Sequence, residues 1–184
     1  MKRTLLIVIL VLFFIISGLL AYYGMFSPLN VEEKTMGPFS LVYQRHTGEY
    51  SGIGPKIEEV RTFLEKELNI YCVRGFGIYL DNPSVTPVEK RRALCGCILD
   101  VDDKDIRARV AKRYSIRDID EGSFVTAEFP SRGKLSYMLG PMKVYPAFEK
   151  YFKGKNIPGG PSMEIYESDR IVFLMALTPG QLRE

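Results

Sequence analysis

A chain of 184 residues is long enough for one folded domain, and too short for two ordinary ones once a membrane anchor is subtracted. The formal net charge of +3 includes Lys2 and Arg3, and without those two the 25 basic residues become 23 against 22 acidic ones, so the folded part is close to neutral. Charges of both signs are scattered, without the one-sided basic surface that nucleic-acid binding requires, and we expect no nucleic-acid partner.

The N-terminal 26 residues are predicted to be a single-pass transmembrane anchor. Leu5 to Tyr23 is an uncharged run of mostly Leu, Ile, Val and Phe, long enough to span most of a hydrocarbon core, so the bilayer is the expected partner. A cleaved signal peptide is the alternative, but Leu19-Leu20-Ala21 is a poor cleavage site. Because Lys2 and Arg3 precede the run, the positive-inside rule places the N-terminus in the cytoplasm and the domain outside.

The rest of the chain divides into a short polar tether, residues 27–35, a folded domain, residues 36–180, and a tail, residues 181–184. Alternating and helical spacings of apolar residues predict a first series of elements. These are a strand at 39–45, a helix from Pro55 to about Asn69, strands at 75–80 and 93–99, and a connecting helix at 102–114.

The second half repeats this order. It is predicted to contain a strand at 123–129, a turn at 131–133, a helical stretch to about Lys153, and strands at 162–167 and 171–177. Gly140-Pro141 is expected to break or kink the long helix. Corresponding Tyr79 and Tyr166 stand 87 residues apart, which supports an internal repeat. The predicted fold class is therefore α+β, with two tandem strand-helix-strand-strand modules after one transmembrane helix and a cleft between them.

The three cysteines do not form a dense disulfide framework. Cys95 and Cys97 share one face of a predicted strand and lie too far apart to bond each other. A bridge from Cys72 remains open in an oxidising compartment, but three small buried hydrophobic residues are favoured. With one histidine, His46, and no CxxC or HExxH pattern, we expect no metal site, and no cofactor is predicted.

Four segments resemble the GyrI-like domain family: Val42–Tyr50, Gly77–Pro83, Tyr145–Phe148 and Met163–Tyr166. The resemblance covers nearly everything after residue 36 and implies the same two tandem modules. Among the members it resembles are receptors for autophagy of the endoplasmic reticulum that carry an N-terminal membrane helix. That likeness implies the alternative placement, an ER membrane with the domain in the cytosol.

The resemblance also implies a pocket between the modules that takes small amphipathic or cationic molecules, with a carboxylate near its floor. Glu164 is the candidate, because strand alternation puts it on one face with Tyr166 and puts its apolar neighbours on the other. The remaining candidate walls are Tyr79, Tyr43, Tyr145 and Phe148. A surface glutamate and ordinary core aromatics are the competing interpretations.

The leading hypothesis is thus a membrane-anchored module that captures a small amphipathic or cationic molecule. The alternative is an adaptor that recruits proteins to an organelle membrane, and a third is a hydrolase of small strained compounds. Family members that hydrolyse such compounds use a Trp and Glu pair, and because this chain has no Trp we expect no enzyme. An open cavity at Glu164 favours the ligand-binding hypothesis, and a filled interface favours the adaptor.

Overall fold

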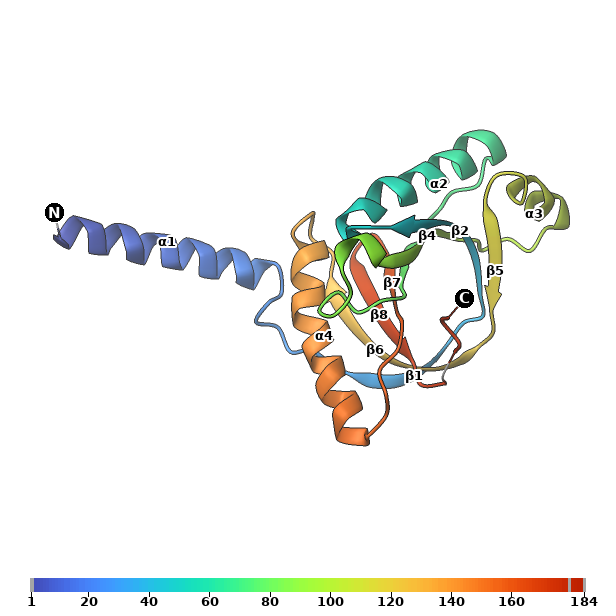
Figure 1. The fold of residues 1–184 in the computed structure, drawn as a ribbon. Coiled ribbons are helices and arrows are strands. Elements are labelled where there is room, and N and C mark those ends of the chain that lie inside the picture. Colours follow the sequence, from blue (N-terminus) through green and yellow to red (C-terminus); the bar gives the residue numbers. More distant parts are fainter. Residues whose placement is uncertain (1, 179, 184) are drawn as a thin grey trace.

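The computed structural model describes residues 2–178 and 180–183, and it combines a long N-terminal helix with a curled sheet (Figure 1). The helices are α1 (Lys2–Tyr22), α2 (Ile53–Leu68), α3 (Lys104–Val110) and α4 (Ser136–Lys155), with 3₁₀ turns η1 (Tyr50–Gly52) and η2 (Val88–Lys90). The strands are β1 (Glu32–Met36), β2 (Phe39–Thr47), β3 (Gly75–Tyr79), β4 (Arg92–Ile98), β5 (Ser115–Ile119), β6 (Gly122–Pro130), β7 (Ser162–Tyr166) and β8 (Arg170–Ala176).

The strands form one eight-stranded antiparallel sheet in the order β1-β6-β8-β7-β3-β4-β2-β5. Its two halves are β2-α2-β3-β4 and β6-α4-β7-β8, which confirms the predicted pair of strand-helix-strand-strand modules. The modules meet where β7 pairs with β3, and Gly77 lies opposite Glu164 in that register. The centre of the sheet is therefore the boundary between the modules.

The modules also exchange strands at their outer edges. β1 precedes β2 in the chain, yet it pairs with β6 of the second module, while β5 precedes β6 and pairs with β2. Only Gly37 and Pro38, joined by a cis peptide bond, separate β1 from β2. Because β1 lies at one end of the strand order and β2 lies next to the other end, the sheet curls almost into a closed ring (Figure 1).

Side-chain alternation gives the curled sheet two apolar faces. Met163 and Ile165 point into the curl, where they join a core with Phe76, Leu94 and Phe124. The other face carries the long helices, with α2 over β2, β3 and β4 and α4 over β6 and β8 (Figure 1). The structure thus confirms the alternation predicted for β7. The β7 residues that alternate with Met163 and Ile165 face the helices.

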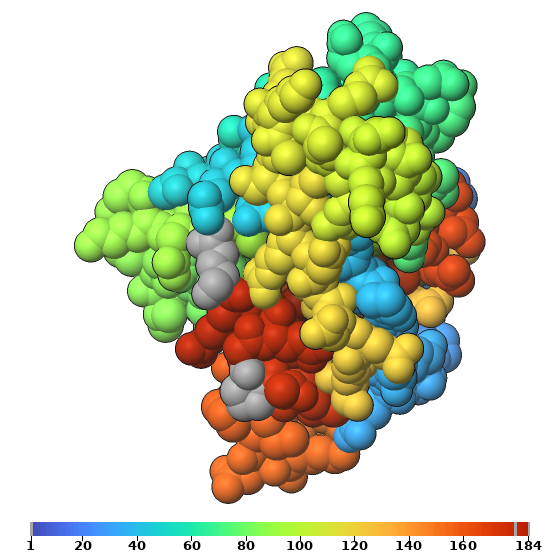
Figure 2. Space-filling view, turned by 90° about the vertical axis from the view of Figure 1, so that its right-hand side faces the viewer, coloured from blue at the N-terminus to red at the C-terminus, as the bar shows by residue number. Residues whose placement is uncertain are grey.

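Two segments belong more closely to the domain than the sequence predicted. Residues 32–35 of the predicted tether belong to strand β1, which pairs with β6. Leu182, in the predicted tail, is 1% exposed and lies in the core inside the curl. The Arg117 guanidinium donates to the carbonyl oxygens of Gln181 and Arg183. Figure 2, which looks at the side opposite α1, shows the C-terminal segment in red seated among neighbouring elements.

The connecting helix, α3, is shorter than the predicted 102–114, and Asp103 caps its start by accepting from the backbone N–H groups of Asp105 and Ile106. The following strand, β5, was not predicted. It is a short edge strand with partly exposed residues, so it carries little apolar alternation.

Of the break or kink predicted at Gly140-Pro141, the break is wrong, because α4 continues through both Pro141 and Pro146. An interior proline costs a helix roughly 3 kcal/mol. Burial of one face of α4 offsets that cost. Its buried residues lie in an apolar core between α4 and the sheet, the outer core, which includes Leu139, Val144, Phe148 and Phe152. Gly140 also lies so close to the sheet that an added Cβ would meet Phe173 at 2.9 Å.

The expectation of three unpaired cysteines is also wrong. Cys72 and Cys97 form a disulfide across 25 residues, which joins the segment after α2 to the middle strands of the sheet. Cys95 is free and buried on the same strand. Spacing within the β4 strand excluded only the Cys95–Cys97 pair, and the partner of Cys72 depends on how the chain after α2 returns to the sheet.

Candidate ligand-binding site

Glu164 lies in the middle of β7, on the helix-bearing face of the sheet, at the boundary between the modules. The residue is only 3% exposed. Its carboxylate accepts a hydrogen bond from the Tyr145 hydroxyl of α4 at 2.6 Å and another from the Tyr166 hydroxyl of β7 at 3.1 Å. Among the described residues, no lysine, arginine or histidine forms an ion pair with it.

Two further hydroxyl groups extend this network. The Tyr79 and Tyr166 hydroxyl oxygens lie 2.7 Å apart, and the Tyr145 and Ser162 oxygens lie 3.0 Å apart. Because Tyr166 and Tyr145 donate to Glu164, Tyr79 and Ser162 are left to donate to them. Donated protons therefore converge on the carboxylate from both sides, an arrangement suited to a negative charge.

Burial determines how these groups titrate. Loss of solvent raises the pKa of Glu164 to about 7, although the hydrogen bonds from Tyr145 and Tyr166 act to lower it. The pKa values of Tyr79, Tyr145 and Tyr166 are raised well above their usual value by burial and then by the charge of Glu164. The tyrosines thus stay protonated donors at neutral pH, while Glu164 titrates in the physiological range.

The internal repeat places a single carboxylate at this boundary. Tyr79 and Tyr166 are the repeat-related pair, 87 residues apart, and they touch through their hydroxyl groups. The same offset relates Glu164 to Gly77, its direct neighbour in the β3–β7 register. An added Cβ at Gly77 would lie 3.0 Å from Ile53 of α2. At these equivalent positions, the first module therefore has a glycine, which leaves room for α2, and the second module has the Glu164 carboxylate.

A row of tyrosine rings covers the network from one long helix to the other. The Tyr50 ring, just before α2, packs edge to face against the Tyr79 ring, with 4.8 Å between the ring centroids. The Tyr137 ring of α4 packs in the same way against the Tyr166 ring, with 5.6 Å between the centroids. The hydrogen bond between Tyr79 and Tyr166 closes the middle of the row. Tyr137, at the end of the row, is half exposed. Ring faces and a buried carboxylate are together the chemistry that organic cations bind.

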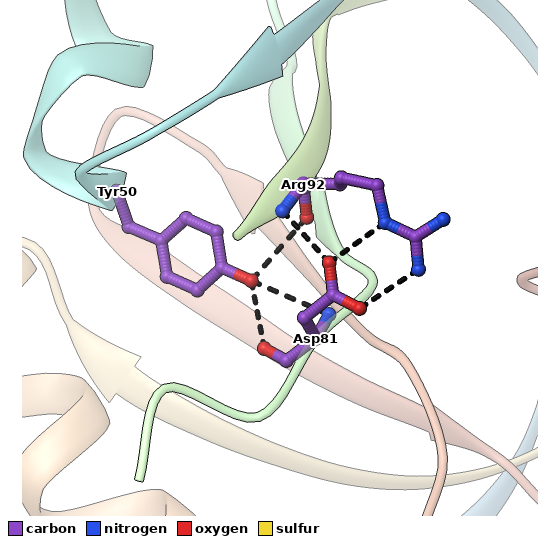
Figure 3. A network of polar contacts seen from close by, with 3 residues as sticks. All are labelled: Tyr50, Asp81 and Arg92. Atoms are coloured by element: carbon purple, nitrogen blue, oxygen red, sulfur yellow. Dashed lines mark hydrogen bonds and ion pairs between the residues drawn. The ribbon is translucent and has the colours of Figure 1, made fainter. Parts of the chain in front are cut away.

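Tyr50 is held at its end of the row by the polar network in Figure 3. Its hydroxyl donates to the Asp81 carbonyl oxygen at 2.7 Å. The Asp81 carboxylate in turn accepts from the Arg92 backbone N–H and guanidinium at 2.8 to 2.9 Å, and these hydrogen bonds with Arg92 lower the pKa of Asp81. The start of α2 and the loop after β3 are joined in this way, which positions the Tyr50 ring against Tyr79.

The structure brings together four of the six predicted site residues: Glu164, Tyr166, Tyr79 and Tyr145. Tyr43 is not among them, because it lies in the core inside the curl, on the opposite face of the sheet. Phe148 packs behind the Tyr145 ring in the outer core and is 1% exposed, so it supports the site and does not line it. The sequence interpretation missed one polar and two aromatic members, Ser162, Tyr50 and Tyr137. Alternation along β7 could have found Ser162, which shares the face of Glu164.

Side chains pack around Glu164, which is 3% exposed and contacts the Tyr145 and Tyr166 hydroxyl groups. The described structure has a hollow of about 480 Å³ along α2, bordered by Glu58, Phe63 and Arg113 among others, and one of about 60 Å³ between β2 and β4. Neither is lined by Glu164. The described residues also contain no group of His, Cys, Asp or Glu able to hold a metal ion.

This architecture, a curled antiparallel sheet of two tandem modules with a helix over each half, is the GyrI-like fold. A solved structure with the same fold is SAV2435 bound to tetraphenylphosphonium, with a TM-score of 0.54 and 12% sequence identity, over 82% of this chain and 94% of that one. At that identity the likeness concerns the fold alone.

Sequence comparison finds relatives among animal proteins. The chain is 30% identical over 144 residues to human testis-expressed protein 264 and 28% identical to the mouse homologue. These matches cover 75% of this chain, but only 44% and 45% of the relatives' length. No family model matches the chain.

Proposed function

We propose that this protein is a membrane-anchored binding module that takes a hydrophobic organic cation at the module boundary and pairs its charge with Glu164. The observation that carries the proposal is a buried carboxylate whose described partners are all neutral hydroxyl groups. Burying such a group costs free energy unless its charge is compensated. A bound cation supplies the missing charge, and the surrounding rings supply its apolar contacts.

The filled interface is compatible with this proposal because of what fills it. The covering groups are tyrosine rings, and the outermost, Tyr137, contacts solvent on one side and Tyr166 on the other. Rotation of exposed aromatic side chains is a small motion compared with separation of the modules. The tetraphenylphosphonium complex of a protein with this fold further supports a cation as the ligand class.

Titration of a rhodamine dye or tetraphenylphosphonium into the full chain, held in lipid nanodiscs at pH 8, tests the proposal. Glu164→Gln keeps the side-chain shape and removes the charge. Because a charge-assisted contact contributes about 1.5 to 3 kcal/mol, we expect the variant to bind the cation about tenfold or more weakly than wild type.

Tyr43→Phe is a matched control, since it alters a tyrosine on the opposite face and should leave the affinity unchanged. The nanodisc itself absorbs hydrophobic cations, and the difference between wild type and Glu164→Gln removes that background. Equal affinity for the two proteins, or no binding by either at millimolar concentration, would contradict the proposal.

A second candidate function is a protein-recruiting adaptor. The filled module boundary favours it, because a recruiting surface needs no internal cavity. This reading assigns the Glu164 network a structural role, joining α4 to the central strands. It predicts that Glu164→Gln leaves cation binding unaltered, so the same titration separates the two functions.

Neither candidate function includes catalysis. Burial raises the pKa of the free Cys95 thiol to about 11, which keeps this thiol from acting as a nucleophile.

The anchor part of the proposal concerns α1, which is long and apolar enough to cross a bilayer and has no residue buried in the domain. Lys2 and Arg3 at its start and the Cys72–Cys97 disulfide both favour an extracytoplasmic domain. We expect the chain to stay in membranes washed with alkaline carbonate, and external protease to digest the domain. Protection of the domain until the membrane is opened would indicate the cytosolic placement.

A further inference from the structure

Two basic side chains of the domain hold the junction with α1 by donating to backbone carbonyl oxygens there. The Arg132 guanidinium donates to the Tyr22 carbonyl oxygen and lies 5.3 Å from the centre of the Tyr22 ring. The Lys143 ammonium donates to the carbonyl oxygens of Gly24 and Ser27. The chain just after α1 is thereby attached to the N-terminal half of α4, and α1 leaves the domain at a defined place.

Beside this junction, α4 exposes an apolar face. Met138 and Met142, one turn apart, are 56% and 61% exposed, and Leu135 and Tyr137 nearby are also exposed. Tyr22 and Phe26, at the end of α1, are exposed as well. Single exposed apolar residues are ordinary, but a group next to a membrane helix indicates a surface that is covered.

The chain segments that form the junction carry only basic charges. Residues 130–148 include Arg132, Lys134 and Lys143 and no aspartate or glutamate, and residues 22–31 carry no charge at all. The acidic groups of α4 begin only at Glu149, which pairs with Lys153. An apolar face with a basic border matches the interface of a bilayer that contains anionic lipid.

The arrangement in space agrees with this chemistry. Figure 1 shows α1 projecting from the domain next to the N-terminal half of α4, with the two helices running in different directions. When α1 crosses a bilayer, the α4 half next to its end lies at the level of the lipid headgroups.

We propose that the N-terminal face of α4, formed by Leu135, Met138 and Met142 with Arg132 and Lys134, docks on the bilayer that holds α1 and prefers anionic lipid. The inference rests on the membrane anchoring in the proposed function, and it adds a second, peripheral contact. The domain then sits in one orientation on the membrane instead of swinging on its anchor.

Docking would also place one end of the candidate site at the lipid interface. Tyr137, next to the α4 face, is the end of the tyrosine row and contacts the Tyr166 ring. Hydrophobic cations concentrate in the interfacial region, where apolar contact and anionic headgroups both attract them. A ligand could therefore reach Glu164 from the membrane side of the domain.

Because the chain contains no tryptophan, a single introduced tryptophan reports on one position alone. We expect Met142→Trp, in the full chain in nanodiscs, to lose several-fold more fluorescence to brominated lipids than Tyr71→Trp. Tyr71 is an exposed aromatic residue beyond the far end of α2 and serves as the matched control. Quenching of Met142→Trp should increase with the anionic lipid fraction and decrease with salt.

Met138→Trp repeats the measurement one turn earlier, in case one variant folds poorly. Quenching of both α4 probes no stronger than that of Tyr71→Trp would overturn the docking proposal. Retention of the chain in the nanodisc reports separately on α1, and cation affinity reports separately on Glu164. A failure of docking is thus distinguishable from a failure of the anchor or of the ligand site.

Discussion

Cation affinity is expected to fall about tenfold or more when the pH is lowered from 8 to 5. The pKa of Glu164 is raised to about 7 by burial, so the carboxylate is mostly ionised at pH 8 and about 1% ionised at pH 5. Only the ionised form pairs its charge with a cation, so the apparent affinity falls with the ionised fraction until it reaches that of the neutral form. Titrations of a permanently charged phosphonium at several pH values measure this directly.

Glu164→Gln provides the matched control, because a neutral amide has no titration in this range. Its weaker affinity should stay constant from pH 8 to 5, and the two proteins should converge at low pH. A wild-type affinity that does not change with pH would mean that the charge on Glu164 plays no part in binding.

The same carboxylate should make the fold less stable as the pH rises. Its pKa is raised from 4.5 to about 7 in the folded protein, so the folded state binds the proton more tightly than the unfolded state. Stability is therefore greatest below about pH 4.5 with respect to this group and is lost as the pH rises towards 7. We expect a cost of up to about 3 kcal/mol at pH 8.

Denaturant unfolding of wild type and Glu164→Gln over this pH range measures that cost. The variant should be the more stable protein at pH 8 and should lose its advantage near pH 4.5. A binding residue that destabilises the empty protein is the pattern expected of a functional site. A variant that is less stable at pH 8 would instead support a structural role for the hydrogen bonds from Tyr145 and Tyr166.

Local patterns in the sequence predict most of the fold. Alternation located β2, β4, β6, β7 and β8, helical spacing located α2 and α4, and the 87-residue offset located the repeat. The failures have non-local causes. β1 is a strand because it pairs with β6, about ninety residues away, and its own residues are mostly charged. α4 passes through Pro141 because of the core that its other face buries.

The candidate site was predictable in part for the same reason. The alternation of β7 places Glu164 and Tyr166 on one face, and the repeat relates Tyr166 to Tyr79. Nothing local assigns Tyr43 to the opposite face of the sheet, since that requires the register of β2 against β4. Tyr50 and Tyr137 come from turns and helix ends that approach the site only after the modules pack.

The other large effect is expected from the Cys72–Cys97 disulfide. Loss of a cross-link between residues 25 apart should lower the free energy of unfolding by roughly 3 to 4 kcal/mol, because the unfolded chain regains conformational freedom. For a domain of this size, the melting temperature should fall by roughly 10 °C. Thermal unfolding of the full chain with and without reductant gives the measurement.

Cys95→Ala separates the bridge from the free thiol, because it removes a buried cysteine and leaves the cross-link in place. That variant should keep the full response to reductant, whereas Cys72→Ala should lose it. Identical unfolding of wild type with and without reductant would show that the bond contributes nothing to stability.

The disulfide also bears on membrane topology. Cysteine pairs of a domain outside the cytoplasm are oxidised, and those of a cytosolic domain are kept reduced. Alkylation of the protein in rapidly quenched cells should therefore modify only Cys95 after unfolding, and modification of all three cysteines would place the domain in the cytosol.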